Sequence, residues 1–202
     1  MLAGVNGAGK SSLGGAAIRE AGADYYNPDE AARKLRKSNP GLAQTEANAA
    51  AGLGGKLMLE RAIRERLDFA FETTLGANTM TELLIQAAAA GFAIHVWYAG
   101  LGSPEQHIER VRARVRLGGH DIPEADIRRR FRHSRLNLIR LLPHVASLRV
   151  FDNSFDADPA AGSTPAPRLL LHLEKGVVKN PGNLTDTPEW AKPIVAAVLK
   201  SL

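Results

Sequence analysis

The feature that most constrains this chain is a glycine-rich segment, Gly4–Ser11, which begins after only three residues. Its pattern, G-x-x-x-x-G-K-[ST], surrounds a polyphosphate with backbone N–H groups and the first turn of a helix. Lys10 brings a positive charge to the β- and γ-phosphates, and the Ser11 hydroxyl suits Mg²⁺. Gly7 and Gly9 permit backbone angles that a side chain would block. The segment predicts a nucleotide-phosphate site formed by Asn6, Gly7, Ala8, Gly9, Lys10, Ser11 and Ser12.

Segments with strand and helix patterns alternate after this loop. The expected strands cover residues 24–26, 68–72, 92–98 and 147–151, after a stub at residues 1–3. The expected helices cover residues 11–21, 30–37, 45–67, 79–90, 104–117 and 123–142. This order predicts an α/β fold of the P-loop type, with a mostly parallel sheet and helices on both faces.

The last quarter of the chain has a different pattern. A loop rich in Ala, Pro and Gly covers residues 156–167, and a hairpin of residues 169–173 and 177–178 follows it. We expect an amphipathic helix over residues 187–202. With 45% hydrophobic and 23% charged side chains, residues 1–202 fit a single domain on which 156–202 packs as an appendage.

Composition excludes several kinds of site. The chain has no cysteine, which rules out disulfides, thiolate zinc sites and cysteine nucleophiles. The stretch Gln86–Gly102 is interrupted by His95 and is too short to cross a membrane. Because the glycine loop starts at residue 4, we expect no leader peptide and a cytoplasmic protein. The short first strand fits either a start inside a longer protein or protection by a neighbouring segment.

The formal net charge of +5 comes mostly from residues 110–140. Such a cluster suits nucleic acid, but base-stacking aromatic residues are not interleaved with it, so we expect no nucleic-acid partner. In a chain with a phosphate loop, the cluster instead suits the phosphates of a nucleotide and of a charged substrate. The base-recognition motif of GTPases and the signature of ABC transporters are both absent.

Two carboxylates follow predicted strands at the edge where open α/β sheets bind ligands. Asp29 lies at a strand-to-helix corner after Asn27, where it suits a general base for a hydroxyl acceptor; the alternative is an N-cap of the helix. Glu72, Thr73 and Thr74 follow the next strand. They suit acceptor binding or ordering of magnesium waters, and the alternative is a threonine-rich turn.

Arginines on the two basic helices are candidates for clamping a phosphoryl group. Arg110 and Arg114 are four residues apart and share a helix face. Arg130 and Asn137 flank the buried face of the next helix, where they are expected to face a cleft. Most other arginines of the cluster fit a solvated surface. His120 follows a glycine pair and suits a structural or substrate-contacting role better than metal binding.

These blocks, in this order, resemble the zeta-toxin-like P-loop kinases. The resemblance covers about three quarters of the chain, through Ala3–Ser12, Tyr26–Glu30, Phe71–Leu75, Arg114–His120, Arg129–Phe131 and Phe151–Ser154. The best-known members are toxins of toxin–antitoxin pairs that phosphorylate UDP-N-acetylglucosamine with ATP and Mg²⁺.

The resemblance implies a role for each matching residue. Lys10 and Ser11 correspond to the phosphate and magnesium contacts, Asp29 to the base, and Glu72 and Thr74 to the acceptor site. Asn153 falls in the last block, which implies a nucleotide contact. Arg110 or Arg114 corresponds to a clamping arginine, and His120 stands near the position of the family's second one. A family glutamate that precedes Glu72 corresponds to Glu60 or Glu46.

The sequence therefore predicts an ATP- and Mg²⁺-dependent kinase for a hydroxyl of a nucleotide-sugar or related metabolite. Two alternatives stay open. One is a kinase of NAD or nucleic acid. The other is a nucleotide-gated binding module whose partner is a protein such as an antitoxin.

Overall fold

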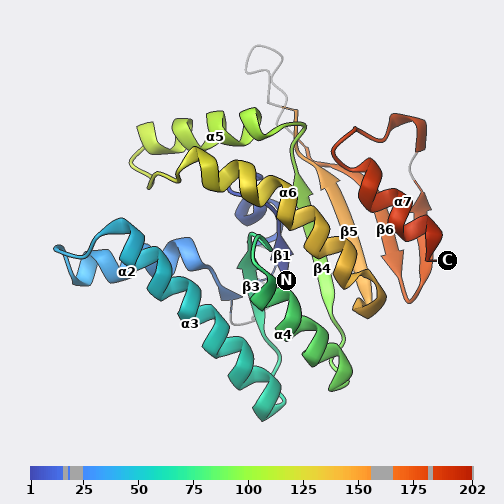
Figure 1. Cartoon of the computed structure of the whole chain (residues 1–202), viewed down its shortest axis with the longest axis horizontal. Helices are drawn as coiled ribbons and strands as arrows, with labels where there is room; N and C mark the ends of the chain where they lie inside the picture. Colours follow the sequence, from blue (N-terminus) through green and yellow to red (C-terminus); the bar gives the residue numbers. More distant parts are fainter. Residues whose placement is uncertain (16–17, 19–24, 156–165, 182–183, 202) are drawn as a thin grey trace.

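The protein folds around one seven-stranded sheet, which a computed structural model describes for residues 1–15, 18, 25–155, 166–181 and 184–201 (Figure 1). The strand order is β2-β3-β1-β4-β5-β6-β7; the first five strands are parallel and the last two antiparallel. The strands are β1 (Leu2–Ala3), β2 (Tyr25–Tyr26), β3 (Ala70–Thr73), β4 (His95–Gly100), β5 (Ser147–Asp152), β6 (Arg168–Glu174) and β7 (Val177–Pro181). The predicted α/β fold with a mostly parallel sheet is confirmed.

The helices follow the predicted order with small shifts at their ends. They are η1 (Ser11–Gly15), α2 (Pro28–Ser38), α3 (Gln44–Glu65), α4 (Asn78–Ala89), α5 (Pro104–Arg116), α6 (Glu124–Leu141), η2 (Leu142–His144), η4 (Leu184–Asp186) and α7 (Lys192–Lys200). Of the predicted helix 11–21, residues 11–15 form η1, and residues 16, 17 and 19–21 lie outside the described residues. The predicted helix 187–202 begins later, at Lys192, because Pro193 suits a first helical turn but not the interior of a longer helix.

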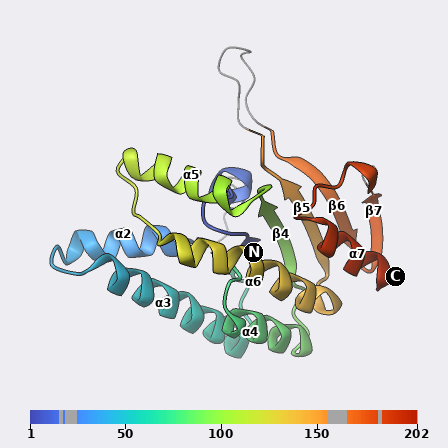
Figure 2. The same cartoon turned by 45° about the horizontal axis from the view of Figure 1, so that its top comes forward.

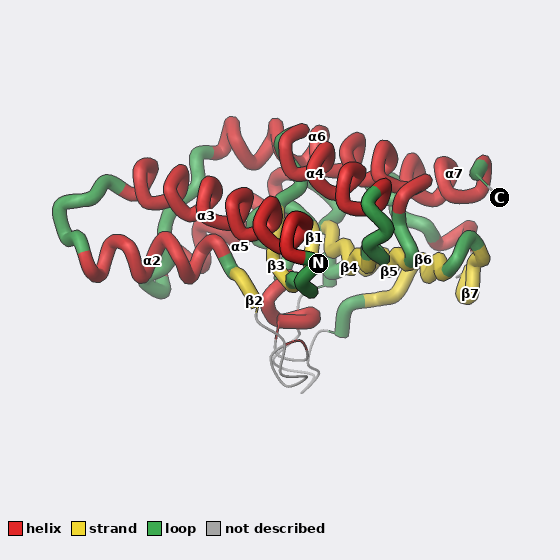
Figure 3. The backbone as a smooth tube through the Cα atoms, turned by 90° about the horizontal axis from the view of Figure 1, so that it is seen from below, coloured by secondary structure: helices red, strands yellow, loops and turns green. Residues whose placement is uncertain are grey.

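More helices pack on one face of the sheet than on the other. Figure 3 shows α4, α6 and α7 on one face. Tyr98 of β4 points to that face, where its hydroxyl lies 2.9 Å from the Ser134 hydroxyl on α6. Its neighbour Trp97 points to the other face, where it meets Gly14 of η1. Helices therefore lie on both faces, as predicted.

The C-terminal segment completes the main core. β6 pairs with β5, and Ile194 and Val198 of α7 join the same buried cluster as Leu148. The Trp190 ring lies 6.3 Å from the Tyr98 ring, centroid to centroid. The predicted hairpin and helix therefore extend the sheet and its core.

Helices α2 and α3 form an arm at one end of the molecule (Figure 2), beside the β2 edge of the sheet (Figure 3). They pack through a small alanine core of Ala32, Ala47 and Ala51. Small side chains let the helices approach closely, which fixes the direction of α2 and of the residues at its start. No helix in the described part of the chain is both long and apolar enough to cross a membrane.

Candidate active site

The glycine loop is held by close backbone contacts at the carboxyl end of β1. Gly7 and Gly9 have φ values of 83° and 79°, a region that favours glycine. A Cβ atom on Gly7 would lie 2.8 Å from the His107 carbonyl oxygen, and one on Gly9 would overlap the side-chain nitrogen of Asn153. That nitrogen donates to the Ala8 carbonyl oxygen at 2.9 Å. Asn153 therefore lies against the loop that the sequence analysis assigns to the nucleotide.

His107, on α5, supports the loop from beneath and was missed by sequence reasoning. It is 1% exposed, and its Nδ1 lies 2.8 Å from the Asn6 carbonyl oxygen. A carbonyl only accepts, so Nδ1 carries the proton. Burial lowers the pKa of His107 to about 4, so the ring is neutral at pH 7. Its place on the buried face of α5, next to Ile108, is the signal that could have found it.

A pocket of about 230 Å³ opens above the loop, and we call it the loop pocket. Its lining residues are Asn6, Gly7, Gly9, Lys10, Ser11, Ser12, Asp29, Glu72, Arg110 and Arg114. The structure thus brings Arg110 and Arg114 to the glycine loop. Burial lowers the pKa of Lys10, while the carboxylates of Glu72 and Asp29 act in the opposite direction.

Glu72 and Ser11 meet at the floor of the loop pocket. The Ser11 hydroxyl donates to Glu72 Oε1 at 2.6 Å, and the Asn27 amide donates to the same oxygen at 3.2 Å. Tyr25 also donates to it. The Ser11 hydroxyl and the Glu72 carboxylate supply oxygen ligands, which Mg²⁺ prefers. In nucleotide sites this ion takes only one or two protein ligands, and phosphates and water supply the others. Although no group of three or more His, Asp or Glu among the described residues suits a metal, Ser11 and Glu72 fit this ion.

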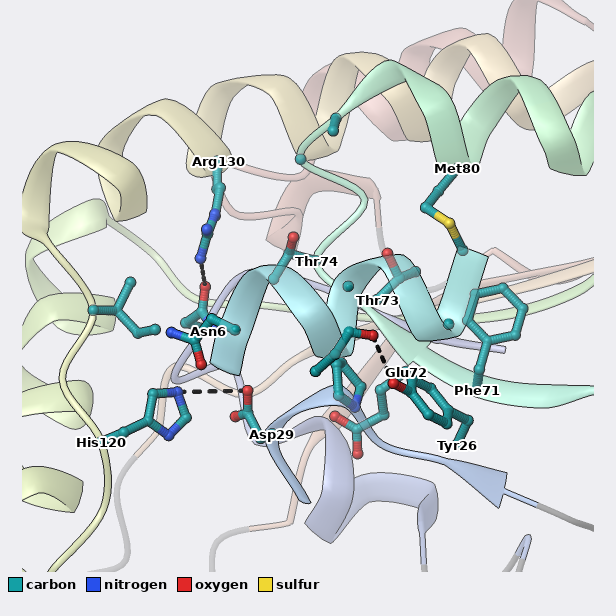
Figure 4. A pocket seen from close by; sticks show the side chains of 18 residues that line it. Asn6, Tyr26, Asp29, Phe71, Glu72, Thr73, Thr74, Met80, His120 and Arg130 are labelled. Atoms are coloured by element: carbon teal, nitrogen blue, oxygen red, sulfur yellow. Dashed lines mark hydrogen bonds and ion pairs between the residues drawn. The ribbon is translucent and has the colours of Figure 1, made fainter. Parts of the chain in front are cut away.

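Asp29 stands at the start of α2 but does not cap it. The cap is Asn27, whose Oδ1 accepts from the backbone N–H groups of Asp29 at 2.9 Å and Glu30 at 3.2 Å. The alternative that Asp29 is the N-cap is therefore wrong. Its carboxylate instead pairs with Arg114 Nη1 at 3.0 Å and lies 3.6 Å from His120 Nε2 (Figure 4).

Arg114 and His120 form one unit with this carboxylate. Arg114 Nη2 donates to the His120 carbonyl oxygen at 3.2 Å, so Arg114 connects the turn after α5 to Asp29. Burial lowers the pKa of His120, and Asp29 opposes that change. Arg114 Nε and His120 Nε2 are buried without a hydrogen-bond partner in the described part of the chain. Arg114 Nε can only donate a hydrogen bond, whereas His120 Nε2 donates or accepts according to the tautomer of the ring.

Arg130 reaches the glycine loop from α6. Its Nη1 donates to Asn6 Oδ1 at 2.8 Å, and Asp126 lies 3.5 Å from Nη2. Burial lowers the pKa of Arg130 from its ordinary value. An arginine on α6 thus meets arginines of α5 at a loop that is far from both in the sequence.

A second pocket of about 230 Å³, the inner pocket, lies on the far side of Asp29 (Figure 4). Tyr26, Phe71 and Met80 give it an apolar floor, while Gly52 and Gly55 of α3 leave room beside it. Its polar lining residues are Asn6, Asp29, Asn48, Glu72, Thr73, Thr74, His120 and Arg130. An apolar floor with a few converging polar groups is typical of small-molecule sites.

Asn137 takes a different place from the one predicted. It is 5% exposed and donates to the Leu75 carbonyl oxygen at 3.0 Å. Leu75 has a φ of 51°, and its N–H donates to Thr73 Oγ1. Asn137 is not among the residues that line the inner pocket, so the prediction of direct substrate contact is corrected. Its amide satisfies a buried carbonyl of the turn that carries Thr73 and Thr74.

Comparisons with known proteins agree with this architecture. No protein-family profile matches the sequence. An uncharacterized protein of Haemophilus influenzae is 32% identical over 128 residues, which make up 63% of this chain and 88% of the relative.

Two solved structures share the fold at low sequence identity. The AvrRxo1-ORF1:-ORF2 complex with ATP contains a chain with a TM-score of 0.67 and 16% identity, covering 98% of this chain and 62% of that one. This chain therefore spans less than two thirds of that neighbour. A chain from the PezAT chromosomal toxin–antitoxin system of Streptococcus pneumoniae has a TM-score of 0.55 and 13% identity, covering 100% of this chain and 83% of that one.

Proposed function

Because this chain belongs to the same family as the Haemophilus influenzae protein and has the zeta-toxin-like P-loop kinase fold, we propose that it is an ATP-dependent kinase. Its proposed acceptor is a hydroxyl of a nucleotide-sugar, such as UDP-N-acetylglucosamine, or of a related metabolite. The neighbour solved with ATP supports the choice of donor.

One observation carries the proposal: Asp29 lines both the loop pocket and the inner pocket. A kinase for alcohols needs a proton acceptor between its phosphate site and its acceptor site. A binding module that only senses nucleotide has no need for a carboxylate at this junction. The small, partly apolar inner pocket also favours a small-molecule acceptor over a nucleic-acid strand.

The proposal assigns a separate role in the reaction to each group of site residues. When bound, ATP supplies the phosphoryl group, and Mg²⁺ held by Ser11 and Glu72 neutralises charge on its phosphates. Asp29 takes the proton of the acceptor hydroxyl. Lys10, with Arg110, Arg114 and Arg130, donates to the phosphoryl oxygens, while Asn6, Asn153 and the loop N–H groups fix the phosphates.

The acceptor side is assigned to the inner pocket. Thr73 and Thr74 offer hydroxyls for the acceptor, and His120 lies beside the base. Asn27 acts indirectly, because it caps α2 and binds Glu72. The apolar floor suits a planar or ring-shaped group of the acceptor.

A protein partner is a further part of the proposal. Both neighbours come from complexes or systems of two components, and one of these is a toxin–antitoxin system. On this basis an antitoxin-like protein is the proposed partner. Co-purification from the native host with a tagged chain tests this part independently of catalysis.

The central test is ADP release with ATP and Mg²⁺ in the presence of one acceptor at a time. The panel contains UDP-N-acetylglucosamine, another nucleotide-sugar, NAD, a short oligonucleotide and no acceptor. Acceptor-dependent release that disappears in Lys10→Ala supports a kinase and identifies the acceptor class. Release that ignores every acceptor would favour hydrolysis or a nucleotide-gated module.

A matched pair of carboxylate variants tests the base. Asp29→Asn removes the proton acceptor, so transfer falls by about 10²- to 10⁴-fold, while ATP binding stays nearly unchanged. Glu109→Gln removes a carboxylate charge at an exposed position of α5 that lines neither the loop pocket nor the inner pocket, and is expected to keep transfer. Equal activity of the two variants would remove Asp29 from the base role.

A further inference from the structure

A third pocket, of about 480 Å³, lies on the outer side of Asp29, and we call it the outer pocket. It shares Asp29 and His120 with the inner pocket, and it shares Ser11 and Arg114 with the loop pocket. Its remaining walls come from α2, from the start of α3 and from the turn after α5. A ligand whose hydroxyl lies at Asp29 can therefore extend into this space.

One face of α2 forms the long wall of the outer pocket. Asp29, Arg33 and Arg36 follow one another at intervals of four and three residues, so they share this face. At 1.5 Å per residue, Arg36 lies about 10 Å along the axis from Asp29. Arg33 lies nearer, about 6 Å along the axis, so the helix sets two fixed axial distances between Asp29 and the cations that follow it.

Neutral groups hold Arg36 at this end of the pocket. Arg36 Nε donates to the Leu42 carbonyl oxygen at 3.3 Å, and its Nη1 donates to Gln44 Oε1 at 2.9 Å. Both acceptors are neutral. Within the described ranges, neither Arg33 nor Arg36 forms an ion pair. The carboxylates of the pocket, Asp29 and Glu30, lie about one helical turn before Arg33 and about two turns before Arg36.

The contacts of Arg36 distinguish it from an ordinary surface arginine. A free arginine loses side-chain entropy when it binds an anion. Here the Leu42 carbonyl oxygen and the Gln44 side chain at the start of α3 already hold the guanidinium, and Nη2 forms no hydrogen bond within the described residues. A preorganised, unneutralised guanidinium with a second arginine one turn away matches the oxygen pattern of a phosphate or diphosphate.

We propose that Arg33 and Arg36 form a specificity-determining anion subsite for the acceptor. The phosphate or diphosphate group of the acceptor binds them while its reacting hydroxyl lies at Asp29. The inference rests on the proposed kinase function for the role of Asp29. It predicts that a neutral sugar is a poor acceptor even when its ring fits the inner pocket.

The subsite is tested by direct binding of inorganic pyrophosphate, so the readout does not need turnover. The protein is first saturated with Mg²⁺ and a non-hydrolysable ATP analogue to fill the loop pocket. Calorimetry then compares the wild type with Arg33→Ala/Arg36→Ala. The matched control is Lys34→Ala/Lys37→Ala, which removes the same charge from exposed positions of α2 that do not line the pocket.

The arginine variant is expected to bind pyrophosphate at least tenfold more weakly, and the lysine variant within about twofold of the wild type. Circular dichroism confirms that each variant is folded. Equal loss in both variants, no loss in either, or no binding to the wild type would each overturn the subsite. A failed acceptor assay beside the expected binding result would reject the kinase proposal and leave the anion subsite standing.

Displacement experiments identify the source of the anion. UDP-N-acetylglucosamine, NAD and N-acetylglucosamine compete in turn with bound pyrophosphate. Displacement by either phosphate-bearing compound supports the subsite and distinguishes a nucleotide-sugar from a dinucleotide. Displacement by N-acetylglucosamine as strongly as by the others, or by none of the three, contradicts it.

Discussion

The glycine loop and the acceptor side of the site face each other across Asp29, yet different contacts hold them in place. The loop is fixed by close contacts of its own backbone. At Gly7 and Gly9, atoms of His107 and Asn153 occupy the space that a Cβ atom would need. The acceptor side is built from side chains of α2, α3, α6 and the turn after α5. This side is also less buried, since Leu117 in the turn after α5 is 89% exposed. On the proposed function, the side fixed by backbone contacts binds the phosphates, which all nucleotides share, and the side built from side chains binds the acceptor, which differs between kinases.

The largest expected effect concerns the histidine beneath the loop. The unfolded chain protonates His107 as the pH falls through 6.5, whereas the folded chain does so near 4. The free energy of unfolding therefore falls as the pH drops through this window, by on the order of 3 kcal/mol from this residue. Urea unfolding at pH 7 and pH 4.5 measures the loss. His107→Gln should reduce it, while the exposed His144→Gln should not; equal losses in all three proteins would contradict the assignment.

A pair of glycine variants compares crowding with backbone strain. Gly9 and Gly118 have φ values of 79° and 84°, but a Cβ on Gly118 meets nothing within 4 Å. Gly9→Ala must displace Asn153 and is expected to weaken binding of the ATP analogue about 100-fold, or about 2.7 kcal/mol. Gly118→Ala should bind it within about twofold. Calorimetric binding curves that are alike for both would show that crowding does not define the loop.

On the acceptor side, Asn137→Ala should destabilise the turn that carries Thr73 and Thr74. It leaves the buried Leu75 carbonyl oxygen without its donor, at a cost of about 2 kcal/mol in the free energy of unfolding. The acceptor KM should rise while ATP-analogue binding is unchanged. Ser134→Ala, which loses a buried hydrogen bond elsewhere on α6, is the control. A matching KM increase in the control would indicate general loosening of α6.

The smallest expected effect concerns the proposed contact of Glu72 with magnesium. Glu72→Gln removes a negative charge beside Ser11 and should raise the Mg²⁺ concentration for half-maximal nucleotide binding about tenfold. Tyr25→Phe removes one donor to the same oxygen but keeps the charge, so a smaller change is expected. A magnesium titration of nucleotide binding compares them. An unchanged midpoint in Glu72→Gln would place the ion elsewhere.

Local pattern was enough to predict much of the fold. The glycine loop, the alternation of strands and helices, and the antiparallel hairpin all follow from short-range periodicity and turn chemistry. The placement of Asp29 at a strand-to-helix corner was predicted in the same way. The late start of α7 was missed because an apolar periodicity extends upstream of Pro193, whereas the helix does not.

What the sequence by itself determined is the phosphate loop and the kinds of residue that approach it, because spacing along one strand or helix fixes which side chains share a face. Tertiary structure decided which of them meet. It paired Arg114 with Asp29 across 85 positions and Arg130 with Asn6 across 124. It also placed His107 under the loop and Asn137 under the turn. Such contacts depend on how helices pack over the sheet, and residue spacing carries no information about that packing.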